Sequence, residues 1–263
     1  MKNEFAQLIE QIGVSPSEKN TDELAKIARY FADTFPFENL DVLQKNTEKI
    51  TPQFLNEKLV KQKRGGLCYE INAFLYLVLQ ALEYDVVLVK GTVHTENGWA
   101  TEGTHVLNIV NLHNKRYVLD NGFGSNITRK PLEIDGAPVD APTGTFRVVQ
   151  RESDKGTYAY EKFEKGEWVL KFAFHLEPIA WDELNHIKQV ITESEASAFN
   201  RQIIISQCLK HETYSINESR LRVKRTDMQE KDTIFHSEEE LLHAIKQRSN
   251  SSIYVQAQKI LLK

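Results

Sequence analysis

The sequence contains few of the residues that mark secreted, metal-binding or membrane-spanning proteins. Its 263 residues include only two cysteines, Cys68 and Cys208, which are too few and too far apart for a disulfide framework or a multi-cysteine metal site. No HExxH motif or paired Cys/His spacing occurs, so we expect no bound metal. Cys208, within the apolar segment IIISQCL, is expected to be a buried apolar residue.

Long apolar runs are absent as well. No stretch reaches the roughly 18 apolar residues of a membrane-spanning helix, and the first residues, MKNEFAQLIEQIGV, lack the apolar run of a secretory signal. We therefore expect a cytoplasmic protein with no membrane partner.

An excess of positive charge is also missing. The formal net charge is −4, the sequence pI is about 6.1, and lysine and arginine are spread along the chain. Nucleic-acid binding needs clustered positive charge, so we expect no nucleic-acid partner. With 41% apolar residues, the chain can bury one large core or two coupled ones.

The first third of the chain predicts helices. Apolar residues recur every three or four positions within residues 5–12 and 24–31, which builds one apolar face of a helix. Two glycines at 65–66 interrupt the pattern just before Cys68, and a broad apolar stripe follows over residues 71–82. We therefore expect Cys68 at the start of a buried helix.

From Asp85 onward the pattern changes to short runs rich in Val, Ile, Thr and aromatic residues, which predict antiparallel strands of a barrel or sheet. These runs occupy residues 86–93, 104–112, 115–120, 146–150, 157–163 and 167–174. Beyond Trp181 we expect helix to about Gln207, short strands near 221–223 and 233–235, and a helix near 238–246.

Cys68 is the first candidate for chemistry. A cysteine at a helix start faces unpaired backbone N–H groups and the positive end of the helix dipole, and both favour the nucleophilic thiolate. A lone cysteine is, however, more often a buried apolar residue. Position alone leaves both interpretations open.

Two further side chains have the right chemistry to assist a cysteine. His105 opens a predicted strand, and Asp120 ends another just before the turn NGFG. An Asp at a strand end usually forms a turn, and eight histidines dilute the signal from any one of them. In the functional interpretation, Asp120 orients the His105 imidazole, which pairs with the thiolate.

Four ordered motifs join these residues. They are PFENLDV at 36–42, RGGLCYEIN at 64–72, THVLNIV at 104–110 and VLDNGFG at 118–124. Together they resemble the arylamine N-acetyltransferase family, whose Cys-His-Asp triad matches Cys68, His105 and Asp120. The resemblance covers roughly residues 1–200. The chain departs from the family at Asn121 and in the proline-free segment 94–103.

The resemblance implies an α+β fold with a cysteine-protease-like catalytic core. We expect an N-terminal helical bundle at 1–84 carrying the cysteine, and a central antiparallel β-barrel at 85–180 carrying the histidine and aspartate. A C-terminal α/β lid is expected at 181–263, where the last sixty residues match the family poorly.

The resemblance also implies the reaction. Acetyl-CoA would donate its acetyl group to Cys68, and the resulting thioester would pass it, in ping-pong order, to the nitrogen of a small aromatic amine. Hydrazines and N-hydroxyarylamines are further acceptors. The family's role in xenobiotic metabolism is implied too, although the sequence does not separate detoxification from a biosynthetic task, or a monomer from a homodimer.

The matching motifs also suggest binding residues. Phe37, Thr104 and Phe123 correspond to substrate-binding positions, where aromatic walls suit flat amines. The loop residues expected to bind the coenzyme are Thr101, Glu102 and Gly103. Glu38 and Arg64 are expected to form an ion pair that braces the active-site helix.

Other protein classes remain open at this point. A cysteine hydrolase or transglutaminase-like enzyme uses the same triad, with water or another acceptor in place of the amine. A binding module without catalysis is the third class.

Overall fold

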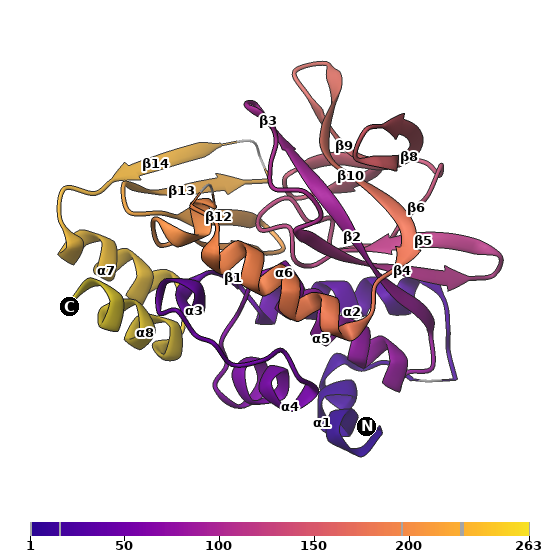
Figure 1. The fold of residues 1–263 in the computed structure, drawn as a ribbon, viewed down its shortest axis with the longest axis horizontal. Helices are drawn as coiled ribbons and strands as arrows, with labels where there is room; N and C mark the ends of the chain where they lie inside the picture. The colour runs from indigo at the N-terminus through magenta and orange to yellow at the C-terminus, as the bar shows by residue number, and fades with distance from the viewer. Residues whose placement is uncertain (1, 16, 196, 227–228, 263) are drawn as a thin grey trace.

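The chain folds into a helical part, a barrel-like sheet and a smaller sheet covered by two helices, as Figure 1 shows. The computed structural model describes residues 2–15, 17–195, 197–226 and 229–262. Within these ranges no helix has both the length and the apolar character needed to cross a bilayer.

The helical part surrounds one almost fully buried helix. Its helices are α1 (Lys2–Ile12), α2 (Thr21–Thr34), α3 (Leu40–Leu43), α4 (Pro52–Leu55) and α5 (Cys68–Ala81), with a π-helical segment at Asn56–Lys61. Twelve of the fourteen residues of α5 are buried, because its apolar residues surround the helix instead of following one stripe. The predicted buried helix beginning at Cys68 is confirmed.

The central strands form an antiparallel sheet that nearly closes on itself. They are β2 (Asp85–Thr95), β3 (Gly98–Trp99), β4 (His105–Leu112), β5 (Lys115–Leu119), β6 (Leu132–Glu133), β7 (Val139–Ala141), β8 (Gly144–Ser153), β9 (Gly156–Glu164) and β10 (Glu167–Pro178). The order is β6-β5-β4-β2-β10-β9-β8-β7, with β3 on β2. A bridge between Ile134, just after β6, and Val148 of β8 connects the first strand in this order to the strand before the last. The α+β class with a central barrel is confirmed.

Turn chemistry explains the tight connection between β4 and β5. His113 and Asn114 both have positive φ, as a two-residue hairpin turn with the right-handed twist of the flanking strands requires. The turn sets the register that places Asn108 opposite Leu119. Because the strands are antiparallel, this register brings Asp120, the residue that follows β5, close to the beginning of β4, where His105 lies.

The smaller sheet combines one short strand from the first part of the chain with four strands from its last part. Its strands, in spatial order, are β1 (Phe37–Glu38), β11 (Ile205–Cys208), β12 (Glu212–Ile216), β13 (Arg220–Arg225) and β14 (Glu230–Ile234). Helices α7 (Glu238–Arg248) and α8 (Ser251–Leu261) cover one face (Figure 1). Because β1 pairs with β11, this sheet reaches back to the helical part.

One secondary-structure prediction is wrong. Helix was expected from Trp181 to about Gln207, but α6 (Trp181–Glu193) ends earlier, and Ala198–Asn200 form only a short 3-10 turn. The segment Ile205–Cys208 is a strand because it pairs with β1 on one side and β12 on the other. The strand β12 and the helix α8 were not anticipated. The division into domains at 84 and 180 stays a prediction.

Candidate active site

Cys68 is the first residue of α5 and lies deep in the molecule. Its side chain is 7% exposed, and its Sγ donates to the Thr104 carbonyl oxygen at 3.5 Å. Leu67 precedes the helix in an extended conformation, and the Glu70 carboxylate accepts a hydrogen bond from its backbone N–H. The glycines at 65–66 and this cap therefore start the helix at the cysteine, as predicted.

His105 begins β4 and projects toward Asp120. Its Nε2 lies 2.8 Å from Asp120 Oδ2, and both side chains are buried. Burial opposes the charged imidazolium, but the charge and hydrogen bond of Asp120, together with the Cys68 side chain, outweigh it and raise the pKa of His105 to about 10. The imidazole is therefore protonated at neutral pH.

Asp120 directly follows β5, where the backbone turns. Its second oxygen, Oδ1, accepts hydrogen bonds from Asn72 Nδ2 at 2.7 Å and from the Gly122 backbone N–H at 2.8 Å. The fold thus brings together three predicted side chains from a helix, a strand start and a strand end. It also adds Asn72, which the sequence argument had not singled out.

Aromatic rings enclose the histidine. The centroids of Phe123 and Phe172 lie 5.1 Å and 4.7 Å from that of His105, and Tyr160 stacks on Phe172. Phe123 was predicted to line the site, whereas Phe172 and Tyr160 were missed, because an aromatic strand residue looks the same whether it faces a site or a core. These rings reduce the access of water to the imidazole.

Of the other two predicted substrate-binding residues, Thr104 contacts Cys68, and Phe37 lies near the turn that follows Asp120. Phe37 is half-buried and packs on Phe199 at a centroid distance of 5.8 Å, and it also approaches Gly124. The Thr104 carbonyl oxygen accepts a hydrogen bond from the Cys68 thiol, and the Thr104 Oγ1 donates one to the Thr101 carbonyl oxygen at 2.8 Å.

The predicted coenzyme loop leads directly to His105. Gly103 has a positive φ and donates its N–H to Thr92 Oγ1 at 3.0 Å. Glu102 is 71% exposed, and its carboxylate pairs with Lys155 Nζ at 2.8 Å. This hydrogen bond lowers the pKa of Glu102. The carboxylate is therefore held against the β8–β9 turn.

A buried ion network braces α5. The Arg64 guanidinium binds Glu38 Oε1 and Asp41 Oδ1, each at 2.7 Å, and Lys58 Nζ bridges Asp41 at 2.9 Å and Glu70 at 2.7 Å. Burial opposes the charge of Asp41, but the two cations outweigh it and lower its pKa to about 2. The expected pair between Glu38 and Arg64 is present, within a larger network.

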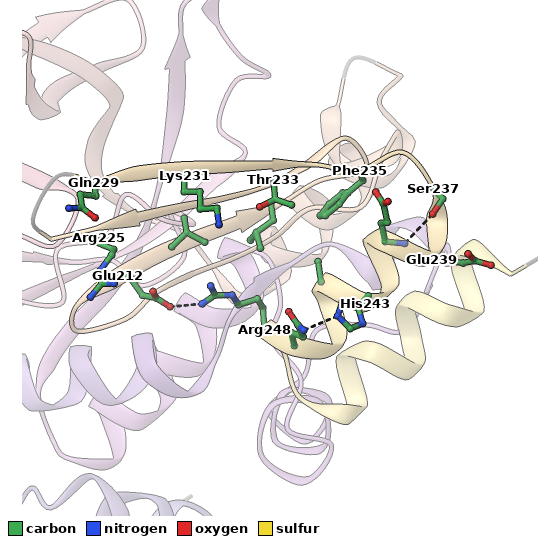
Figure 2. A pocket seen from close by; sticks show the side chains of 15 residues that line it. Glu212, Arg225, Gln229, Lys231, Thr233, Phe235, Ser237, Glu239, His243 and Arg248 are labelled. Atoms are coloured by element: carbon green, nitrogen blue, oxygen red, sulfur yellow. Dashed lines mark hydrogen bonds and ion pairs between the residues drawn. The ribbon is translucent and has the colours of Figure 1, made fainter.

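A cavity of about 870 Å³ lies in another part of the fold. It is a groove between β13, β14 and α7, and Figure 2 shows Lys231, Thr233 and Phe235 on its sheet side and His243 and Arg248 on its helix side. None of the predicted site residues lines it. The size of this cavity is therefore no reason to place the candidate site there. Among the described residues, no group of three or more His, Cys, Asp or Glu side chains is arranged to hold a metal ion.

Comparison with known sequences agrees with this geometry. The model of the N-acetyltransferase family matches residues 20–259. The uncharacterized acetyltransferase YvcN of Bacillus subtilis (strain 168) is 36% identical over 210 residues, which are 79% of this chain and 82% of that protein. Probable arylamine N-acetyltransferase 3 of Dictyostelium discoideum is 31% identical over 188 residues, and the match spans 64% of this chain and 61% of that protein.

Solved structures share the fold. The NAT3 arylamine N-acetyltransferase from Bacillus cereus, described with a Cys-His-Glu catalytic triad, superposes with a TM-score of 0.84 at 29% identity, covering 95% of this chain and 98% of that one. The Mycobacterium marinum arylamine N-acetyltransferase in complex with CoA gives a TM-score of 0.81 at 19% identity, covering 96% and 98%. At that identity the likeness concerns the fold alone. Since the family model covers most of the sequence, the chain belongs to the arylamine N-acetyltransferase family and is an acyltransferase.

Proposed function

We propose that this enzyme moves an acetyl group from acetyl-CoA, through a thioester on Cys68, to the nitrogen of an arylamine. The observation that carries the proposal is the contact chain from Cys68 to His105 to Asp120. Here the third member is an aspartate, whereas the Bacillus cereus relative is described with a glutamate. Both are carboxylates that can orient an imidazole.

The first half-reaction exchanges one thioester for another. The Cys68 thiolate attacks the acetyl carbonyl carbon, and the bond between that carbon and the coenzyme sulfur then breaks. Protonated His105 gives its proton to the departing coenzyme thiolate. Because a thioester replaces a thioester, the acetyl group on Cys68 stays reactive toward an amine.

The second half-reaction restores the enzyme. The amine nitrogen attacks the acetyl carbon of the Cys68 thioester, neutral His105 accepts the amine proton, and the carbon–sulfur bond breaks to release the amide. The thiolate and imidazolium are then regenerated. This order of events gives ping-pong kinetics. The raised pKa of His105 supports the charged resting pair.

The start of α5 supplies a donor for the tetrahedral intermediate. The first N–H groups of a helix have no partner within it, and Cys68 is the first residue of α5. We propose that its backbone N–H donates to the developing oxyanion, which also benefits from the helix dipole.

Aromatic and loop residues are proposed to bind the two substrates. Phe37, Thr104 and Phe123 would hold an arylamine, a hydrazine or an N-hydroxyarylamine beside the thioester, since flat apolar walls favour flat rings. The main chain of Thr101, Glu102 and Gly103 would contact coenzyme A. The relative solved with CoA supports a coenzyme site in this fold.

A reducing compartment suits this chemistry. Both cysteines are free and buried, and a free cysteine nucleophile persists where thiols are kept reduced. We therefore propose a cytoplasmic enzyme that acetylates small aromatic amines, including xenobiotic ones.

The proposal is tested by following release of free coenzyme A thiol from acetyl-CoA with a panel of arylamines and hydrazines. We expect release that depends on the amine and is abolished in Cys68→Ala. Cys208→Ala is the matched control, because burial raises the pKa of that thiol to about 12, so this variant keeps full activity. Release at the same rate without amine identifies a hydrolase, and an active Cys68→Ala enzyme contradicts the assignment of the nucleophile.

A further inference from the structure

Asn72 lies beneath the triad, one helical turn from the cysteine. It is fully buried and sits on α5 four residues after Cys68, so the two side chains project from the same face of the helix. It belongs to the RGGLCYEIN motif, yet the mechanism above gives it no task. A buried amide is costly unless its polar atoms are paired, which makes its partners informative.

The Asn72 side chain connects the elements that carry the triad. Its Nδ2 donates to Asp120 Oδ1 and to the Val106 carbonyl oxygen, both at 2.7 Å. Its Oδ1 accepts the backbone N–H of Asn121 at 2.9 Å. Because two acceptors face one end of the amide and a donor faces the other, its orientation follows from the network. The Asn72 side chain thus binds Val106, which follows His105 in the sequence. It also binds Asp120 and Asn121.

The two carboxylate oxygens of Asp120 form hydrogen bonds with different partners. Oδ2 faces His105, whereas Oδ1 is occupied by Asn72 and by the Gly122 N–H. Rotation of the carboxylate away from His105 would break both bonds at Oδ1. The side-chain donor comes from the helix of the nucleophile, so it also fixes the position of that helix relative to the carboxylate.

We propose that Asn72 is a positioning residue of the triad, holding the Asp120 carboxylate in the orientation that pairs with His105. The inference rests on the proposed roles of Cys68, His105 and Asp120. Asn72 touches no reacting atom and acts through Asp120.

The titratable groups around Asp120 determine what a change in the pH profile of an Asn72 variant would mean. Among the described residues, His105 on β4 and Tyr160 on β9 are the titratable groups that interact with Asp120, and Cys68 on α5 interacts with His105. Burial, followed by the charge of Asp120, raises the pKa of Tyr160 well above its ordinary value, so its hydroxyl stays neutral. A change in pH profile on altering Asn72 therefore reports on the Cys68–His105–Asp120 system.

The experiment compares three variants of the full chain: Asn72→Ala, Asn72→Asp and Asn108→Ala. Asn108 is the matched control, since it is fully buried and donates to the Asn72 carbonyl oxygen at 3.0 Å, but none of its hydrogen bonds reaches Asp120. The readouts are kcat and KM with acetyl-CoA, and the rate of Cys68 alkylation by iodoacetamide from pH 5 to 9.

For Asn72→Ala we expect kcat to fall about 100-fold, as a displacement of about 1 Å at a reacting centre can cause, with little change in KM. The midpoint of Cys68 alkylation should shift to higher pH, because a freely rotating carboxylate holds the imidazolium less well. Asn108→Ala should keep the wild-type alkylation profile. A profile and a kcat in Asn72→Ala equal to those of Asn108→Ala would overturn the inference.

Asn72→Asp has the same shape but can donate to Asp120 only when protonated. Its activity should therefore rise as pH falls below neutrality, opposite to the wild type, and this result keeps the test informative if Asn72→Ala does not fold. A wild-type pH profile in Asn72→Asp would contradict the positioning role. An active Cys68→Ala enzyme would instead remove the proposed function, which separates the two failures.

Discussion

The Nε2 atom of His105 lies 2.8 Å from Oδ2 of Asp120, inside the barrel and away from solvent. Asp120 and the thiol side chain raise the pKa of this imidazole to about 10, above its ordinary 6.5. Between these values the folded protein holds a proton that the unfolded chain has released. The stability contributed by His105 is therefore complete below about pH 6.5 and is lost as the pH approaches 10.

We expect the free energy of unfolding in urea to fall between pH 7 and 10 by up to about 1.4 kcal/mol per pH unit from this group. Both proteins in the comparison carry Cys68→Ala, because a thiolate in the folded state would offset the proton that His105 holds, and Asp120 is the main group that raises the pKa of His105. With His105→Gln added, this part of the slope should disappear, because no proton is then held at the site. Equal slopes for the two proteins over this range would show that the imidazole is not held protonated.

Lys58 should be essential for stability. Its side chain is 3% exposed, and its ammonium group bridges Asp41 and Glu70. Lys58→Met therefore leaves two buried carboxylates without their shared partner. We expect a loss of about 3–5 kcal/mol in urea unfolding at pH 7. The control is Lys61→Met, which should unfold at nearly the same urea concentration as the wild type, because the pair between Lys61 and Glu57 is exposed. Similar values for the two variants would refute a structural role for the network.

Gly122 should tolerate no side chain. A Cβ atom there would lie 2.6 Å from Cys68 Cα and 2.6 Å from Asn72 Nδ2, so Gly122→Ala must displace the start of α5. We expect about 100-fold lower acetyl-CoA turnover from this misplacement. Gly98→Ala is the control, because nothing lies within 4 Å of its Cβ position. That variant strains a surface turn, so it should lose stability but keep its turnover per folded molecule. Unchanged turnover in Gly122→Ala would contradict the described packing.

The ion pair between Glu102 and Lys155 should tune coenzyme binding. The pair is at the surface, so neither Glu102→Gln nor Lys155→Ala should measurably alter the stability of the fold. If the loop faces the coenzyme phosphates, Glu102→Gln should lower the KM for acetyl-CoA, and Lys155→Ala should raise it. Both differences should shrink in 0.5 M KCl, because salt screens exposed charges. KM values that match the wild type at low salt would place the phosphates elsewhere.

Local patterns account for the elements that were predicted well. The glycines at 65–66 and the apolar stripe over 71–82 are features of neighbouring residues, and they sufficed to place Cys68 at a helix start. The turn at His113 and Asn114 is likewise local, and the strands on either side of it were predicted. Such features depend on backbone sterics and periodicity within a few residues.

The errors occur where distant segments pair. Residues Ile205–Cys208 form a strand because β1, from the first part of the chain, and β12 lie on either side, and this pairing overrides the local helical pattern. Lys58 is another example, since a lysine on a short helical segment is expected at the surface. It is buried only because Asp41 and Glu70 reach it from two other elements.

The sequence alone determined the family, through four ordered motifs, and it provided the proposed triad of Cys68, His105 and Asp120. It also determined the start of the cysteine's helix, because glycines and apolar spacing act locally. Only the tertiary structure decided how the triad is held. Asn72 acquires its position because α5 packs against β4 and the turn after β5. Hydrogen bonds of under 3 Å between these elements form only after the buried core has brought the elements together.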